Sequence, residues 1–312
     1  MLSWSDGRSQ FVLDFSLHGE KGKKEGKEQG LTAKQRQERF SRERTKDSPA
    51  AQRKEEYFVS KCDRLIAMVK AAILRKIPFD YLLVDSWFTN TALVDFVYRC
   101  HKQFHLLGMA KMGNTKYQSE WGDITAKALI SKLNNNKKIR YSRALRCHYA
   151  ITDVTLGQRK VRLIFCRRGK SNGWKLLLTT DISLDFKKAY RIYAMRWAIE
   201  VFFSDAKRHL GLADCSCRDF TSQVAHVSMV IVRYNLMGYI KRFHDYETIG
   251  ALFSEIHLGV KELTVVEAIW ETIIEVVAIV AELFSLDQEQ LLSQILLDNR
   301  RLKAMRELAQ TA

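Results

Sequence analysis

The stretch KIPFDYLLVDSWFTN, residues 76–90, decides the fold class because it places a buried strand between two helical patterns. Its proline ends the helix predicted over 57–76, and the apolar run that follows predicts a strand over 79–85. Helical spacing returns over 91–102. This succession is typical of an α/β protein, in which Asp85 would lie at the carboxyl end of a strand, where such sheets place their sites. A helix N-cap or turn aspartate is the alternative reading of Asp85.

The regions around this stretch differ in pattern. Alternation around an Asp-Gly pair predicts a β-hairpin over residues 4–18. The charged run from 19 to about 56 predicts an exposed loop or frayed helix that buries little surface. Short alternating segments between glycine and asparagine turns predict a mainly β region over 108–180. Two further helices are expected, over 185–210 and 222–243.

The charge of the chain is concentrated in its first part. The 312 residues carry 51 Lys and Arg against 35 Asp and Glu, a net charge of +16. Residues 245–312 carry 12 acidic and 5 basic side chains, so the preceding 244 residues carry +23. This surplus favours a polyanionic partner, nucleic acid before membrane, although a basic protein without such a partner remains an alternative.

The sequence shows neither a membrane span nor a signal peptide, so we expect a cytoplasmic protein. Its six cysteines form no C-x-x-C pair. Cys215 and Cys217 lie near His209 and His226, which raises zinc as an alternative. The spacing fits structural zinc patterns poorly, and reduced thiols are the preferred interpretation.

A row of chemically active side chains lies along one face of the helix predicted over 185–210. Tyr193, Arg196, Glu200 and Lys207 fall within a stripe about 60° wide and about 21 Å long on an α-helix. A carboxylate between basic residues suits metal-assisted phosphoryl transfer, with the carboxylate on the cation and the bases on the DNA backbone. An ordinary amphipathic helix with an Arg196–Glu200 ion pair is the alternative.

The spacing Tyr193-x2-Arg196-x3-Glu200-x6-Lys207 resembles the Y-R-E-K signature of DDE transposases of the insertion sequence 4 family. It lies within RIYAMRWAIEVFFSDAKRHLGL. FDYLLVDSWFTN is similar to the family's strand with the second catalytic aspartate, and WSDGRSQFVLDFSLH to the hairpin after the first aspartate. LLLTTDISLDFKKAY and HVSMVIVRYNLMGYI resemble the segments before and after the catalytic helix.

The resemblance implies an α/β fold with an RNase H-like core. The core would comprise residues 1–107 and 181–244, with a mainly β insertion over 108–180 and an acidic helical region over 245–312. The implied reaction is Mg²⁺- or Mn²⁺-dependent cleavage at transposon ends, followed by attack of the 3′-hydroxyl on target DNA.

The resemblance also implies roles for individual residues. Asp85 and Glu200 would be catalytic metal ligands, and their hard oxygens suit Mg²⁺ or Mn²⁺. Tyr193, Arg196 and Lys207 would contact DNA. The family's first aspartate precedes the hairpin, and Asp6 and Asp14 match the hairpin instead, so we expect an N-terminally truncated transposase with impaired strand transfer.

Three other interpretations stay open: a non-catalytic DNA-binding remnant, a different RNase H-like nuclease, and an interaction protein built on the acidic tail. In that tail apolar residues recur at helical spacing and indicate either core packing or a homodimer contact. These residues are Leu263, Val266, Ile269, Ile273 and Val276.

Overall fold

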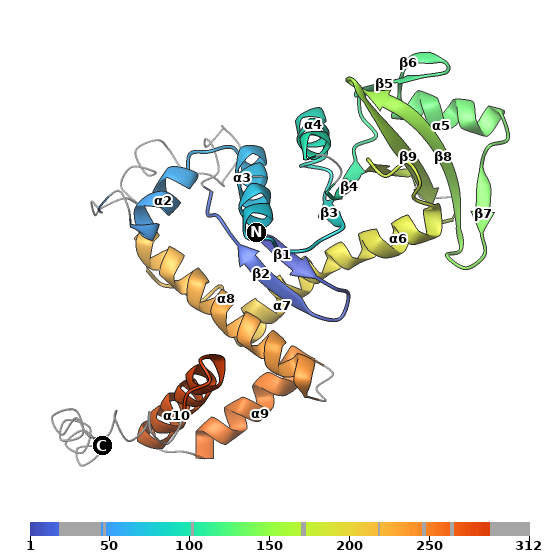
Figure 1. Ribbon diagram of the computed structural model, residues 1–312. Coiled ribbons are helices and arrows are strands. Elements are labelled where there is room, and N and C mark those ends of the chain that lie inside the picture. Colours follow the sequence, from blue (N-terminus) through green and yellow to red (C-terminus); the bar gives the residue numbers. More distant parts are fainter. Residues whose placement is uncertain are drawn as a thin grey trace. The chain divides into compact units, whose positions relative to one another are not determined.

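The computed structural model describes residues 1–18, 45, 48–100, 103–169, 173–217, 219–244, 248–262 and 265–287. The chain divides into two compact units, of which the first is Met1–Arg242 and the second begins at Phe243 (Figure 1). None of the described helices combines the length and apolar character that a membrane span needs.

The first unit is a mixed α/β structure, and the strands in its described residues form two sheets. Its strands are β1 (Leu2–Ser5), β2 (Gln10–Asp14), β3 (Tyr81–Val84), β4 (His105–Ala110), β5 (Lys116–Ser119), β6 (Gly122–Thr125), β7 (Arg140–Ser142), β8 (Cys147–Leu156), β9 (Arg159–Arg167) and β10 (Lys175–Thr179). Its helices are α2 (Pro49–Glu56), α3 (Lys61–Leu74), α4 (Thr91–Arg99), α5 (Ala126–Asn135), α6 (Phe186–Ala194), the 3₁₀ turn η1 (Met195–Trp197), α7 (Ala198–His209) and α8 (Phe220–Phe243), whose last residue belongs to the second unit.

The larger sheet has eight strands in the order β3-β4-β10-β9-β8-β5-β6, with β7 paired to β8. β3 and β4 are parallel, and the other pairs are antiparallel. The strands expected over 79–85 and in the β-rich region therefore join one sheet. The expected domain boundary between residues 107 and 108 falls inside β4.

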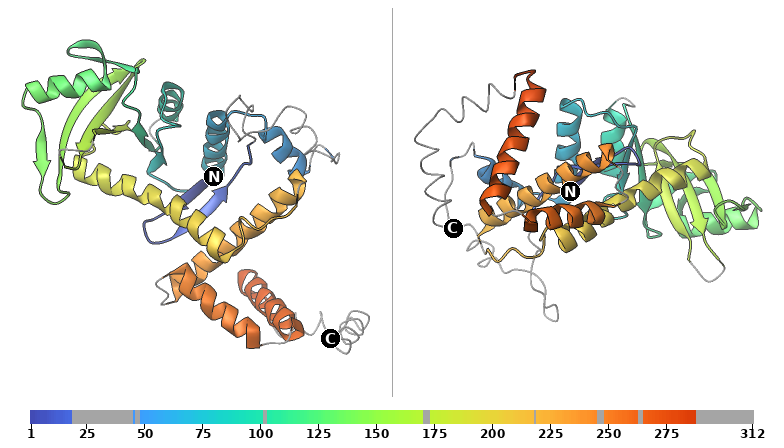
Figure 2. Two further views of the ribbon diagram at one scale, coloured as in Figure 1. Left: turned by 180° about the vertical axis from the view of Figure 1, so that it is seen from behind. Right: turned by 90° about the horizontal axis from the view of Figure 1, so that it is seen from below.

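Helices cover both faces of this sheet. Alternate side chains of β10 point to opposite faces and contact different helices. Leu176 and Leu178 pack on one face with side chains of α3, α4 and α5. Leu177 points to the other face and packs with Phe186 and Ala189 of α6. The two views in Figure 2 show α6 running on into α7 along the unit. Because both faces of β10 are buried, its sequence is a continuous apolar run and does not alternate between apolar and polar residues.

The hairpin predicted over 4–18 is confirmed as β1 and β2. Asp6 accepts the backbone N–H groups of Arg8 and Ser9, and Gly7 takes a φ of 88° that favours glycine. The outer edge of β2 is closed by Asn235 of α8, whose amide bonds both backbone groups of Val12 at 2.8 and 2.9 Å. The hairpin is thereby fixed against α8.

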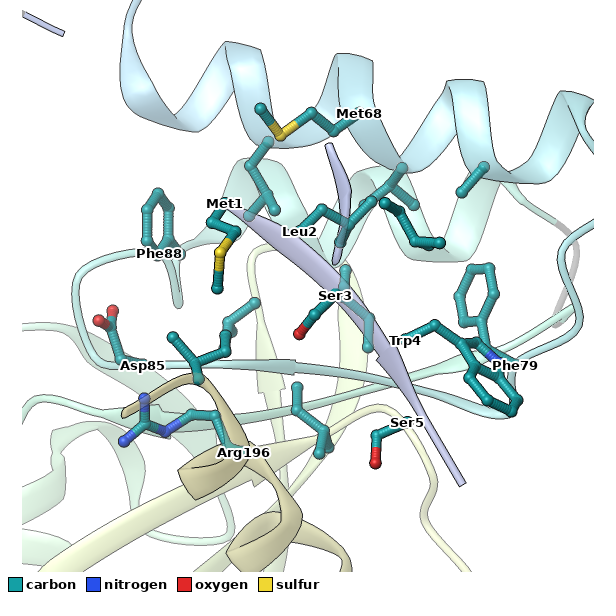
Figure 3. A pocket seen from close by; sticks show the side chains of 18 of the residues that line it. Met1, Leu2, Ser3, Trp4, Ser5, Met68, Phe79, Asp85, Phe88 and Arg196 are labelled. Atoms are coloured by element: carbon teal, nitrogen blue, oxygen red, sulfur yellow. The ribbon is translucent and has the colours of Figure 1, made fainter. Parts of the chain in front are cut away.

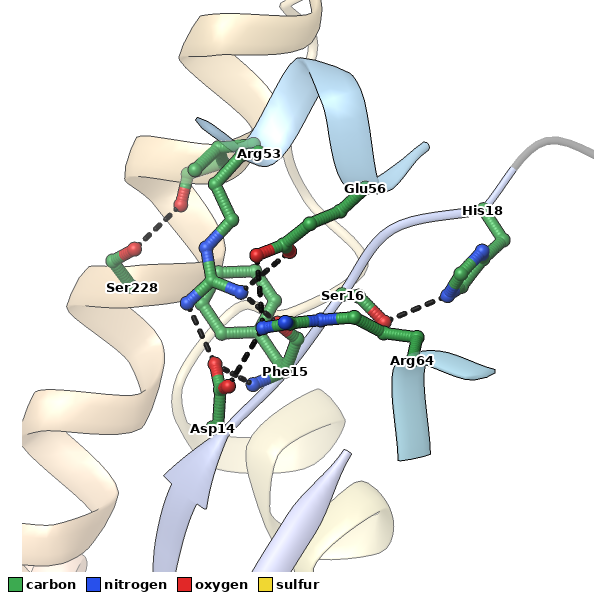
Figure 4. A network of polar contacts seen from close by, with 9 residues as sticks. Asp14, Phe15, Ser16, His18, Arg53, Glu56, Arg64 and Ser228 are labelled. Carbon is green, nitrogen blue, oxygen red and sulfur yellow. Dashed lines mark hydrogen bonds and ion pairs between the residues drawn. The ribbon is translucent and has the colours of Figure 1, made fainter. Parts of the chain in front are cut away.

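The charged run over 19–56 was predicted to be an exposed loop or frayed helix, and residues 19–44 of it lie outside the described part of the chain. Residues 49–56 form helix α2, which takes part in a network of ion pairs (Figure 4). Arg53 contacts Asp14 at 2.7 Å and Glu56 at 2.9 Å, and Arg64 of α3 contacts the same two carboxylates at 2.8 Å. The prediction that this run buries little surface is confirmed over α2, which has no buried residue, but its ion pair with Asp14 of the hairpin was not predicted.

In its described residues, the region expected to be mainly β holds strands β5 to β10 and also the helix α5, which Thr125 caps and whose apolar residues pack against the sheet. One expectation needs correction. The single helix expected over 185–210 is interrupted by η1, so its residues do not keep a uniform 100° spacing. The expected end is correct, since α7 stops at His209 and Gly211 has a φ of 69°.

The second unit contains α9 (Ile249–Glu262) and α10 (Val265–Leu283). Of the expected apolar stripe, the side chains of Leu263, Val266 and Ile269 lie outside the described part. Val276 is exposed and Ile273 is half-buried.

Candidate active site

Asp85 follows β3 directly and begins a tight turn. Its Oδ1 accepts the N–H of Trp87 at 2.8 Å, and its carbonyl oxygen accepts the Thr89 hydroxyl at 3.0 Å and the N–H of Phe88 at 3.3 Å. Asp85 is therefore a turn aspartate, which was the alternative interpretation of this residue in the sequence analysis. Its side chain is nevertheless exposed at the end of a strand, and Figure 3 shows it at one end of a pocket.

Gly108 of β4 packs directly against this turn, and the sequence analysis did not identify this residue. A Cβ atom on Gly108 would overlap Thr89 Oγ1 and would lie 2.7 Å from Val84 Cγ2. Only glycine leaves room for the turn that carries Asp85. An isolated glycine inside the apolar strand HLLGMA was the available signal, since such glycines mark close approach of another group.

Replacing Gly108 with alanine is expected to lower the free energy of unfolding by about 1–3 kcal/mol, because β-branched Thr89 and Val84 have little rotamer freedom to move aside. Displacing Thr89 also breaks its bond to Asp85. Gly113→Ala is the control, as an added Cβ there would meet only Lys111 Cβ, at 4.0 Å. Urea unfolding of both variants measures the difference; equal losses would show that Gly108 is not a packing requirement.

Arg196 and Glu200 lie where the 3₁₀ turn joins α7. Arg196 Nη2 donates to Glu200 Oε1 at 2.7 Å, so the alternative ion pair is present. The other carboxylate oxygen, Oε2, is buried and has no hydrogen-bond partner among the described residues. An unsatisfied buried carboxylate oxygen is costly unless a cation or donor binds it.

Tyr193 connects this pair to the sheet. Its ring lies 5.8 Å from the Arg196 guanidinium carbon, and the residue packs, like Met109 of β4, against the buried cluster that includes Leu177. Burial raises the pKa of Tyr193, and the nearby Asp85 carboxylate raises it further. Burial opposes the charge of Arg196, but Glu200 and Tyr193 hold its pKa above the ordinary value. Tyr193, Arg196 and Glu200 thus form one chain of neighbours, and Asp85 lies near Arg196 in the lining of the same pocket.

Lys207 lies outside this chain of neighbours. It is exposed on α7, seven residues beyond Glu200, which is about 10 Å along a helix. Trp87, which the sequence analysis did not select, is also exposed, and Lys111 Nζ lies 5.1 Å from its ring centroid. An aromatic face and a cation therefore stand beside Asp85, a combination that stacks on bases and contacts phosphates.

Within the described part of the chain, no group of three or more His, Cys, Asp or Glu side chains is placed to hold a metal ion. His226, one of the residues considered for zinc, uses its Nε2 atom in a different contact: it lies 2.9 Å from the carbonyl oxygen of Gly211.

The comparison with protein families supplies the identification. Residues 59–236, more than half of the chain, match the model of the Transposase DDE domain. The chain belongs to this family. The search of curated proteins gave no match. A DDE transposase domain acts on DNA and generally uses divalent metal ions, and the matched range includes every site residue considered above.

Proposed function

We propose that this chain derives from a DDE transposase of the insertion sequence 4 family, with an RNase H-like core that cleaves transposon ends and joins the 3′-hydroxyl to target DNA. The observation that carries the proposal is that Glu200 Oε2, in the segment with the Y-R-E-K spacing, is buried without a hydrogen-bond partner in the described part of the chain. The family match over the same helix supports it. The division into core, insertion and acidic tail at residues 107/108, 180/181 and 244/245 belongs to this proposal.

The carboxylates fit a hard divalent cation. Arg196 holds Glu200 Oε1 and leaves Oε2 for a ligand, and the Trp87 N–H orients the Asp85 carboxylate. Mg²⁺ and Mn²⁺ favour such oxygens. The cations would activate the attacking oxygen and stabilise the leaving one.

The neighbours of the carboxylates have different roles in this proposal. Arg196 lies between Tyr193 and Glu200. Tyr193 and Arg196 therefore position the Glu200 carboxylate as well as contacting DNA. Lys207 is exposed and free to follow the phosphate backbone. A homodimer on paired ends is a further part of the proposal.

We infer that strand transfer by this chain alone is impaired. The early aspartates are engaged elsewhere: Asp6 caps the hairpin turn and pairs with Arg242, while Asp14 pairs with Arg53 and Arg64. Neither is therefore a candidate for the third carboxylate. This also favours a second candidate function, a non-catalytic DNA-binding remnant that uses the basic first unit.

Titration with Mn²⁺, followed by electron paramagnetic resonance, tests the metal site. We expect Asp85→Asn and Glu200→Gln each to weaken Mn²⁺ binding at least 10-fold, which corresponds to about 1.4 kcal/mol. Asp205→Asn on the same helix is the matched control and should leave binding unchanged. Unchanged binding in all three variants, with DNA binding retained, would favour the non-catalytic remnant.

The same proteins are then assayed with transposon-end DNA and Mg²⁺. Cleavage by the unmodified chain should not exceed that of Glu200→Gln, because two carboxylates hold the cations poorly. Efficient Mg²⁺-dependent cleavage that Glu200→Gln abolishes would refute the impairment and leave the metal site supported.

A further inference from the structure

One edge of the eight-stranded sheet carries a row of basic side chains, one or more at each successive strand end. They follow β4, begin β10, end β9, and lie in β7 and in the turn from β7 to β8. These residues, called the basic edge below, are Lys111, Lys175, Arg167, Arg146, Arg143 and Arg140. All are exposed except Arg167, which is half-buried.

The basic edge is the same edge of the sheet at which Asp85 follows β3. The strand register connects Val84 of β3 with Gly108 of β4, and continues through β10 and β9 to Thr152 of β8. β7 pairs with residues 147–149, which lie three to five residues before Thr152. Because β8 runs antiparallel to β3, this beginning of β8 lies toward the Asp85 edge.

The basic edge spans the sheet from the Asp85 side to its far side. β7 lies five strand positions from β3, which is about 24 Å at about 4.8 Å per strand. Figure 1 shows β7 on the far side of the sheet from β3. The basic side chains therefore form a path that begins beside the candidate site and leads away from it.

Carboxylates are scarce along this path. Residues 124–180 contain 14 Lys and Arg but a single acidic residue, Asp153. Arg162 binds Asp153 at 2.7 Å, and the nearby Glu120 is bound by Lys138 at 2.9 Å. Among the described residues, no ion pair includes a member of the basic edge. Since these residues do not neutralise its charge, the surface suits a polyanionic ligand.

We propose that the basic edge binds the phosphate backbone of the duplex that flanks the scissile phosphate. The DNA would run from Asp85 across the strand ends to the turn between β7 and β8. One DNA strand presents a phosphate every 3.4 Å or so along the axis, so long Lys and Arg side chains about 4.8 Å apart reach neighbouring phosphates. A path of about 24 Å corresponds to about 7 base pairs. Such contacts position the duplex without reading its sequence.

The acidic region over 245–312 is the competing ligand within the chain. DNA is favoured because the path is continuous with the Asp85 site and is spaced like a regular polyanion. That the ligand is DNA rests on the proposed function, whereas the position of the surface does not.

Fluorescence anisotropy with a labelled duplex of arbitrary sequence, in EDTA, tests the basic edge without any contribution from metal. The test variant of the full chain carries Arg140→Gln, Arg143→Gln and Arg146→Gln. Each lost phosphate contact reduces the slope of log K against log salt concentration by about 0.9, so we expect a slope smaller by about 2.7. Binding at about 100 mM salt should be at least 10-fold weaker. Circular dichroism checks that the variant is folded.

The matched control carries Lys70→Gln, Arg75→Gln and Lys76→Gln, which remove the same charge from the same unit. These residues are exposed near the end of α3 and before β3, so they lie toward the opposite edge of the sheet from Asp85. The slope of the control should change by less than about 1.

A second variant tests the continuity of the path. Lys111→Gln and Lys175→Gln together should reduce the slope by about 1.8, because the same duplex contacts both parts of the basic edge. An unchanged slope in this variant would separate the β7–β8 turn from the Asp85 site and overturn the path.

Other results would also contradict the proposal. Equal slopes in the test and control variants would mean that net charge alone decides the affinity. An unchanged test variant, with DNA still bound, would exclude the basic edge and leave the proposed function standing, whereas no DNA binding by the unmodified chain at about 50 mM salt would contradict both. Carbodiimide cross-links between Lys175 and residues 245–312 in the DNA-free chain would assign the surface to the acidic region.

Discussion

Replacing Asp14 with alanine is expected to lower the free energy of unfolding of the first unit by about 3 kcal/mol. The Asp14 carboxylate accepts from Arg53 at 2.7 Å and from Arg64 at 2.8 Å, and its side chain is 14% exposed. Without it, two poorly hydrated guanidinium groups share the single carboxylate of Glu56. Urea unfolding followed by circular dichroism measures the loss.

Glu120→Ala provides the control for this prediction. Its partner Lys138 lies at 2.9 Å, but the two side chains are 59% and 51% exposed. Exposed pairs contribute less than about 1 kcal/mol because water screens them. Equal losses from Asp14→Ala and Glu120→Ala would contradict a structural role for the network in Figure 4.

The same network shows why part of the fold escaped sequence analysis. The hairpin and β3 follow from signals within a few residues, such as Asp6-Gly7 and Pro78. Arg53 instead contacts Asp14, 39 residues away, and that ion pair links the charged helix α2 to the hairpin although α2 buries no residue. Local composition cannot reveal such a partner. Helix α5 was within reach, because Ala126, Leu129, Ile130 and Leu133 have helical spacing.

The candidate site, like the fold, was predictable only where a local sequence pattern determines the contact. Helical spacing predicted the Arg196–Glu200 ion pair, and the second carboxylate and the family resemblance marked both residues as candidates for the site. The 3₁₀ turn between Tyr193 and Glu200 was not predictable, since a 3₁₀ turn and an α-helix share the same short-range apolar pattern. The burial of Glu200 Oε2 depends on packing around the helix, which no sequence pattern states.

Replacing Phe202 with alanine is expected to lower the free energy of unfolding by about 3–5 kcal/mol, as for other buried aromatic side chains. Phe202 is 2% exposed, and its ring meets that of Tyr234 in α8 edge-on at 4.8 Å. Burial raises the pKa of Tyr234 to about 12, and its hydroxyl reaches Gln10 of β2. The stack therefore joins α7, α8 and the hairpin.

Val201→Ala is the matched control, because Val201 neighbours Phe202 on α7 but is 42% exposed; its loss should stay below about 0.5 kcal/mol. Since Glu200 is on the same helix turn, Phe202→Ala should also weaken Mn²⁺ binding under conditions where the protein is still folded. Strong destabilisation with unchanged Mn²⁺ affinity would mean that the position of Glu200 does not depend on the packing of α7 against α8. A small stability loss would show that the cavity left by Phe202 is filled by its neighbours.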